Sequence, residues 1–138
     1  GLDYDLPIRY RKAEKLPASQ RQEFVGNTLI AYADEEKRLQ EHNMPIFDFV
    51  ESNNYDVVPD KKRNYFLRVL RDLKPGVSEI LVHCAYRLPG HANSPAVDQR
   101  AMDAKFFQSP EAAETVRRLG LKVITWKQFR ELKEQGAI

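Results

Sequence analysis

The sequence predicts an α/β fold in which short parallel strands alternate with amphipathic helices. Short apolar runs recur between longer segments whose apolar residues are spaced three and four positions apart. Residues that begin or end helices, such as Ser, Asp, Pro and Gly, stand at the borders of these segments. The chain has 138 residues, of which 42% are hydrophobic and 30% charged, and this is enough for one domain with its own core. We therefore expect a single α/β domain over residues 1–138.

Four segments are predicted as strands because they are short, apolar and bounded by turn residues. In chain order they are residues 6–10, 45–50, 77–82 and 121–124. A segment with helical periodicity separates each one from the next, which is typical of parallel βαβ units. The third strand is an almost continuous apolar run, so we expect it to be buried on both faces.

The first two helices are expected to follow the first two strands. Ser19 is placed to cap a helix that runs to about Gln40, with Tyr32 and Leu39 on its inner side. Asp60 is placed to cap the second helix, and the Lys-Pro-Gly sequence at its end stops it. The residues of the second helix that recur at helical spacing, and should face the core, are Phe66, Val69, Leu70 and Leu73.

Three more helices are expected in the second half of the chain. The first covers residues 97–108. Ser109, which is followed by Pro and then Glu, should cap the next helix, and that helix should end at Gly120. Thr125 and Gln128 have the spacing of a capping box and should open the last helix.

His83 follows directly on the third predicted strand and allows two interpretations. It is either a hydrogen-bonded core histidine or a site residue, because ligands of parallel α/β folds bind at the carboxyl ends of strands. Cys84 should point to the opposite face of the strand and pack in the interior, which argues against a Cys–His nucleophile pair. Asp48 lies in a similar position on the preceding strand, where we expect it to cap nearby amides.

Composition excludes several classes of function. With 22 basic and 20 acidic residues the net charge is +2, so neither a broad basic face nor a nucleic-acid partner is expected. No apolar run approaches the roughly 20 residues that span a bilayer, and no membrane partner is expected. The single cysteine cannot form an internal disulfide and favours a reducing, cytoplasmic location. The three histidines, His42, His83 and His91, are too scattered for a recognised metal-binding spacing, and the first and last should be solvated.

Three segments resemble the C-terminal region of the YdjC-type carbohydrate deacetylases, which are also described as polysaccharide deacetylase family proteins. The segments are LKPGVSEILVHCAY at 73–86, DQRAMDAKFFQSPEAAETVRRLG at 98–120 and LKVITWKQFREL at 121–132. The segment DYDLPIRYRK near the start is similar to a strand that follows a metal-binding histidine in that family. The order and spacing of the segments extend the resemblance over most of the chain, most strongly over its second half.

The resemblance implies a (β/α) barrel enzyme that removes the acetyl group from an N-acetylated sugar. In that family a divalent metal, zinc or magnesium, polarises the amide carbonyl and a water, and an aspartate is the base. A histidine protonates the departing amine, and His83 matches this catalytic acid. Arg100 and Asp103 match an Arg-x-x-Asp segment and are implied to support the substrate pocket. A salt bridge on a helix surface is the alternative interpretation of Arg100 and Asp103.

The chain departs from the family pattern at its metal site. The family's metal ligands and base precede the position that corresponds to residue 1, and no Asp-Asp motif or early histidine replaces them here. We therefore expect this chain alone to bind no metal and to be inactive. It resembles the C-terminal half of a larger deacetylase barrel, which needs either its N-terminal half or a second copy of itself. The alternative is a non-catalytic α/β module that binds a ligand or self-associates.

Overall fold

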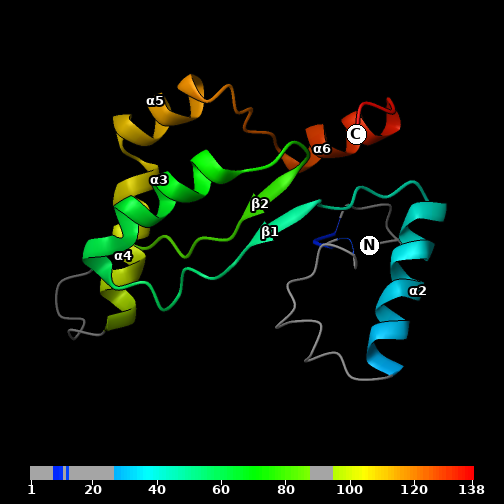
Figure 1. Cartoon of the computed structure of the whole chain (residues 1–138), viewed down its shortest axis with the longest axis horizontal. Helices are drawn as coiled ribbons and strands as arrows, with labels where there is room; N and C mark the ends of the chain where they lie inside the picture. Colours follow the sequence, from blue (N-terminus) through cyan, green and yellow to red (C-terminus); the bar gives the residue numbers. More distant parts are fainter. Residues whose placement is uncertain (1–7, 11, 13–26, 88–94) are drawn as a thin grey trace. The chain divides into compact units, whose positions relative to one another are not determined.

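The computed structural model describes residues 8–10, 12, 27–87 and 95–138 and shows a mixed α/β arrangement (Figure 1). In these residues the elements are α2 (Asn27–Glu41), β1 (Phe49–Glu51), the 3₁₀ turn η3 (Pro59–Lys61), α3 (Lys62–Asp72), β2 (Ser78–Ile80), α4 (Pro95–Phe107), α5 (Pro110–Arg118) and α6 (Trp126–Glu134). The chain divides into two compact units: residues 1–50, 76–79 and 124–138, and residues 51–75 and 80–123. None of the helices among the described residues is long and apolar enough to cross a membrane.

The strands β1 and β2 form a parallel pair, as the alternating pattern predicted. The Phe49 N–H donates to the Val77 carbonyl at 3.4 Å, and the Leu81 N–H donates to the Glu51 carbonyl at 2.8 Å. Each segment thus supplies one donor to the other, with the register of a parallel ladder. Because α3 lies between the strands in sequence, β1, α3 and β2 form a βαβ unit.

Two of the four predicted strands are not strands in the described part of the chain. Residues 8–10 form no strand, and the backbone contacts of this segment with Phe47 are two hydrogen bonds. The Phe47 N–H donates to the Tyr10 carbonyl, and the Phe47 carbonyl accepts from the Lys12 N–H. Residues 121–124 leave α5 without pairing, because the Leu121 N–H donates to Val116 and completes a Schellman motif with Gly120 at φ +67°. Val123, the apolar centre of this segment, is 84% exposed. The described residues therefore form two strands, whereas the predicted half-barrel has four.

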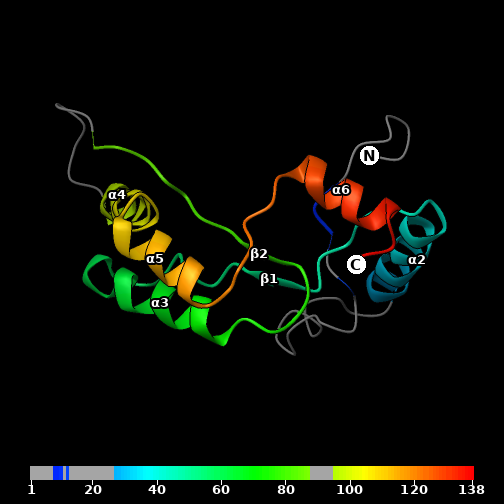
Figure 2. The same ribbon diagram turned by 90° about the horizontal axis from the view of Figure 1, so that it is seen from above.

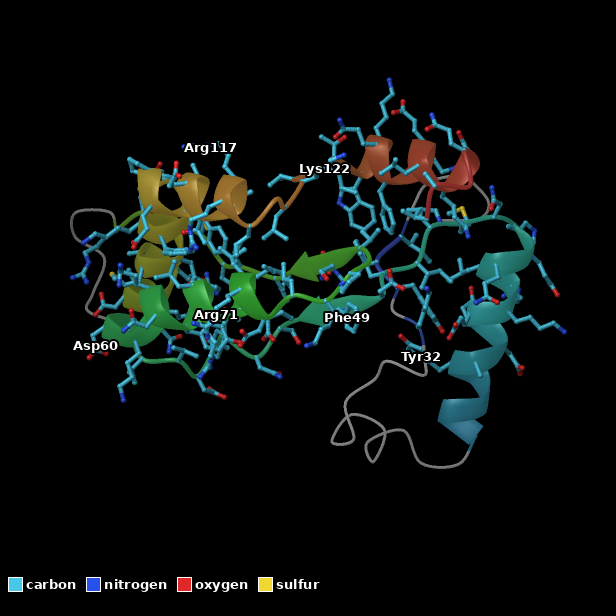
Figure 3. All side chains as sticks on the ribbon, turned by 45° about the horizontal axis from the view of Figure 1, so that its top comes forward. Tyr32, Phe49, Asp60, Arg71, Arg117 and Lys122 are labelled. Carbon is cyan, nitrogen blue, oxygen red and sulfur yellow. The ribbon has the colours of Figure 1, made fainter. Side chains whose placement is uncertain are left out.

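The helix caps near the C-terminus are confirmed, whereas the cap predicted at Asp60 is wrong. Ser109 Oγ accepts from the Ala112 N–H at 3.1 Å, and Thr125 and Gln128 form the complete capping box. Asp60 instead lies inside η3, and α3 begins after Lys61 without a side-chain cap. The reason is the preceding Val-Pro sequence, since Pro59 starts the 3₁₀ turn at its own position. Figure 3 shows Asp60 at this turn and Arg71 near the other end of α3.

The core of the second unit is aromatic and joins α3, α4 and α5, which Figure 2 shows packed together. The Phe66 ring stacks on Phe106 with centroids 5.4 Å apart and meets Phe107 edge-on at 4.8 Å. Leu70, one turn after Phe66, is also buried, as the helical spacing predicted. At the surface, the Arg63 guanidinium holds the Glu111 carboxylate with two nitrogens and links α3 to α5.

The first unit has a separate core around Phe47, which lies two residues before β1. Phe47 stacks on Phe129 of α6 with centroids 4.7 Å apart, and the Trp126 ring meets it edge-on at 5.3 Å. Leu39 of α2 and Met44 are also buried, and the inward position of Leu39 is as predicted. The capping box of α6 thus fixes the start of a helix whose aromatic residues complete this core.

The composition of the third predicted strand suggested burial on both faces, and this prediction is wrong. Four of its apolar residues are only half-buried: Val77, Ile80, Leu81 and Val82. Ile80 and Val82 pack on the aromatic core with one face. Since β1 is the one strand that pairs with β2 among the described residues, the sheet is too narrow to enclose this strand.

Gly76 should tolerate no side chain, and Gly76→Ala is expected to cost about 2 to 3 kcal/mol of unfolding free energy. Its φ is +125°, and a Cβ atom there would lie 2.5 Å from Asp48 Oδ2. That oxygen accepts from the Val77 N–H at 2.9 Å, which confirms the predicted capping role of Asp48. Urea denaturation measures the loss.

The matched control is Gly136→Ala, because Gly136 has φ +66° and a Cβ atom added there would meet no atom within 4 Å. This change should cost about 1 kcal/mol, the penalty of the left-handed conformation alone. Equal losses for the two variants would show that the contact with Asp48 is unimportant.

Candidate functional site

Three buried polar residues gather at the carboxyl end of the strand pair, within the second unit. They are Asn54, which follows β1, Lys62 at the start of α3, and Asp103 in α4, and we call them the buried polar cluster. Their exposed fractions are 0%, 1% and 1%. Buried charges are rare unless they are paired, so the contacts of Lys62 and Asp103 decide what the cluster does.

The ammonium group of Lys62 lies close to three oxygen atoms, two of Asn54 and one of Asp103. Its Nζ lies 2.9 Å from Asp103 Oδ1 as an ion pair, outside hydrogen-bond angles. It donates to the carbonyl oxygen of Asn54 at 2.6 Å and contacts the Asn54 side-chain oxygen at 3.3 Å. The Nζ also lies 5.6 Å from the centre of the Phe66 ring. Lys62 is thus fixed on all sides in the interior.

The buried polar cluster holds the chain that leaves β2 at two points. Asp103 Oδ2 accepts from the backbone N–H of His83 at 3.1 Å, and the Asn54 side-chain amide donates to the carbonyl of Leu81 at 2.5 Å. Because both bonds involve the backbone, they fix the position of residues 81–83 whatever the side chains do. The cluster therefore sets the place from which the His83 side chain projects.

The imidazole of His83 is half-buried beside an exposed aromatic ring. Its Nδ1 atom is buried and has no hydrogen-bond partner in the described part of the chain. The ring of Tyr55, which is 50% exposed, meets the imidazole edge-on at 6.0 Å between centroids. A core histidine would have its ring nitrogens satisfied. The Nδ1 atom of His83 has no such hydrogen bond among the described residues, and this favours the site interpretation.

The structure separates the two residues that were predicted to support the pocket. Asp103 is buried and contacts the His83 backbone, so a surface salt bridge is the wrong interpretation of this residue. Arg100 is exposed, and its backbone carbonyl accepts from the Ala85 N–H at 3.2 Å. The structure therefore brings Asp103 but not the side chain of Arg100 into the buried polar cluster.

Lys62 and Asn54 were not predicted as site residues. Lys62 stands in the run Lys61-Lys62-Arg63, which resembles a solvated helix face. The burial of Lys62 was predictable from its position, because it lies four residues before Phe66 and therefore on the buried face of α3. A lysine at such a position indicates a buried acidic partner.

Cys84 is exposed, and the prediction that it packs in the interior is wrong. The neighbouring His83 is half-buried, and both residues lie beyond the end of β2 at Ile80, where the strand pattern no longer applies. Desolvation of the thiol by its surroundings, followed by the negative charge of Asp103, raises the pKa of Cys84 above its ordinary value.

The raised pKa predicts slow alkylation of Cys84 at neutral pH, since the thiolate is the reactive form. The pH profile of the iodoacetamide reaction should lie at higher pH for the folded chain than for the same chain in urea. Cys84 is the single cysteine, so the total alkylation rate reports on it alone. Coincident profiles for folded and unfolded chains would contradict the assignment.

No group of three or more His, Cys, Asp or Glu side chains that could hold a metal occurs among the described residues. His42 is exposed as predicted, with Nδ1 2.8 Å from the Arg38 carbonyl, and His91 lies outside the described residues.

No protein-family model matches the sequence, and no curated protein matches it. The class that the described geometry defines is thus an α/β protein with a half-buried histidine at the carboxyl end of a parallel strand.

Proposed function

We propose that this chain is the acid-bearing part of a metal-dependent carbohydrate deacetylase, which hydrolyses N-acetyl groups on sugars. The observation that supports it is the environment of His83, whose buried Nδ1 has no partner among the described residues at the carboxyl end of β2. In α/β folds with parallel strands this end is where ligands bind. The resemblance of residues 73–86 to the deacetylase strand that ends in histidine gives the site its proposed chemistry.

The proposed role of His83 is to protonate the departing nitrogen. In the hydrolysis, water adds to the acetyl carbonyl carbon, the carbon–nitrogen bond breaks, and acetate and a free amine result. An amine leaves poorly as an anion, so a proton must reach the nitrogen as the bond breaks, and imidazole can supply it near neutral pH. The half-exposed ring of Tyr55 beside His83 offers an apolar face on which a pyranose ring can stack.

The metal of the proposed reaction, zinc or magnesium, does not fit the described residues of this chain, since they contain no suitable ligand group. We propose that the metal ligands come from outside the described residues. The parts of the pocket that we assign to this chain are the acid His83 and its support Asp103, with Arg100 as a further substrate contact. The lone cysteine is in keeping with a cytoplasmic enzyme.

The direct test is acetate release from an oligomer of N-acetylglucosamine. The longest natural polypeptide that contains residues 1–138 should release acetate and free amine in equal amounts when zinc or magnesium is present. Residues 1–138 alone should release none. Absence of acetate from the longer polypeptide with every N-acetylated sugar offered would contradict the proposal, as would activity of residues 1–138 alone.

A further inference from the structure

The burial of Lys62 is costly, and core packing does not explain it. Lys62, Phe66 and Leu70 lie on one face of α3, where an apolar residue in place of Lys62 would pack without a charge. Taking an ammonium and a carboxylate out of water carries a large desolvation penalty, and their mutual attraction often fails to exceed it. A buried ion pair is thus better explained by a position it specifies than by the stability it adds.

The position that it specifies is the backbone at His83. Asp103 has two carboxylate oxygens, of which Oδ1 faces Lys62 Nζ and Oδ2 accepts from the His83 N–H. The same ammonium contacts Asn54, whose amide donates to the Leu81 carbonyl. Both backbone bonds around residues 81–83 therefore involve residues that Lys62 contacts directly.

We infer that Lys62 is a positioning residue that, through Asp103 and Asn54, fixes the backbone from which His83 projects. The positioning of the backbone does not depend on the proposed function. Only its purpose, to orient His83 as a catalytic acid, rests on that function. Without the ammonium, the group at Asp103 can rotate about its side-chain bonds, and its second oxygen no longer faces the His83 N–H. Asn54 likewise loses the contact that holds its side chain in place.

The experiment compares amide hydrogen exchange in the full chain and in Lys62→Met/Asp103→Asn. This variant leaves no unpaired charge, so it should fold, and residue 103 still has an oxygen that can accept from His83. If Lys62 positions that oxygen, the His83 amide should exchange about 10- to 100-fold faster, relative to the Leu70 amide in the core. The Leu70 amide corrects for any general loss of stability. An unchanged ratio would overturn the inference and leave Lys62 as a charge partner alone.

The matched control is Thr125→Ala, which removes a cap in the other unit and should leave the ratio of His83 to Leu70 exchange unchanged. A changed ratio in this control would show that the ratio responds to stability alone and would overturn the inference. The exchange experiment needs neither metal nor sugar, so its outcome is independent of acetate release. A positive exchange result without acetate release would leave the positioning in place and refute the deacetylase proposal.

Discussion

Lys62→Met is expected to lower the free energy of unfolding by about 3 to 5 kcal/mol, which is a large part of the stability of an ordinary domain. The change removes the ammonium that lies 2.9 Å from Asp103 Oδ1 and leaves a carboxylate that is 1% exposed without a counter-charge. The backbone carbonyl of Asn54 also loses its donor. Urea denaturation followed by circular dichroism measures the loss.

The control that separates charge from packing is the double variant Lys62→Met/Asp103→Leu. Replacing both ions by apolar residues removes the unpaired charge, so we expect the double variant to regain part of the stability that Lys62→Met loses. It should stay below the unchanged chain, because the His83 N–H and the Asn54 carbonyl no longer have their partners. The two changes should therefore be strongly non-additive, as contacting residues are. If the double variant were as unstable as the sum of the two single variants, the ion pair would not be the main interaction of Lys62.

Under the proposed function, His83→Ala is expected to reduce turnover of an N-acetylated sugar by about 10²- to 10⁴-fold in the metal-loaded protein, the range for loss of a general acid. The fold should persist, because Asp103 binds the backbone N–H of His83, which alanine retains. Metal content should be unchanged, because the proposed role of His83 is to donate a proton and not to bind the metal.

His83→Gln is the companion variant, because glutamine has a side-chain amide of similar length that cannot deliver a proton at neutral pH. It should be as inactive as His83→Ala. Recovery of most of the activity by glutamine would assign His83 a hydrogen-bonding role and contradict the assignment as acid.

Local signals in the sequence predicted the helices well. The caps at Ser109 and Thr125 and the positive-φ end at Gly120 depend on residues within one turn of each other, so the sequence pattern contains the whole interaction. The parallel direction of β1 and β2 was predictable for a similar reason. A helix with the strong apolar face of α3 between two strands leads to a parallel pair.

Strand pairing and burial were predicted less well because they depend on residues far apart in sequence. Residues 121–124 have a strand-like composition, yet the N–H of Leu121 is used by the end of α5. The exposure of Cys84 depends on whether another element covers its face, which the strand pattern alone does not encode.

The candidate site was predictable in part. The position of His83 after an apolar strand allowed either a site role or a core role, and the family resemblance implied that Asp103 supports the pocket. The ion pair of Asp103 with Lys62 joins residues from two helices, and neither residue has a local pattern that names its partner. The position of Lys62 four residues before Phe66 was the available signal, because it places a charge on a buried helix face.

The most direct test of His83 as a catalytic acid compares two substrates that differ in their leaving group. An aryl acetate with a weakly basic phenolate leaves without a proton, whereas the amine of an N-acetylated sugar needs one. In the metal-loaded protein, His83→Ala should therefore lose hydrolysis of the sugar amide by about 10²- to 10⁴-fold and keep most of its hydrolysis of the aryl ester. An equal loss on both substrates would contradict the proposal that His83 supplies the proton.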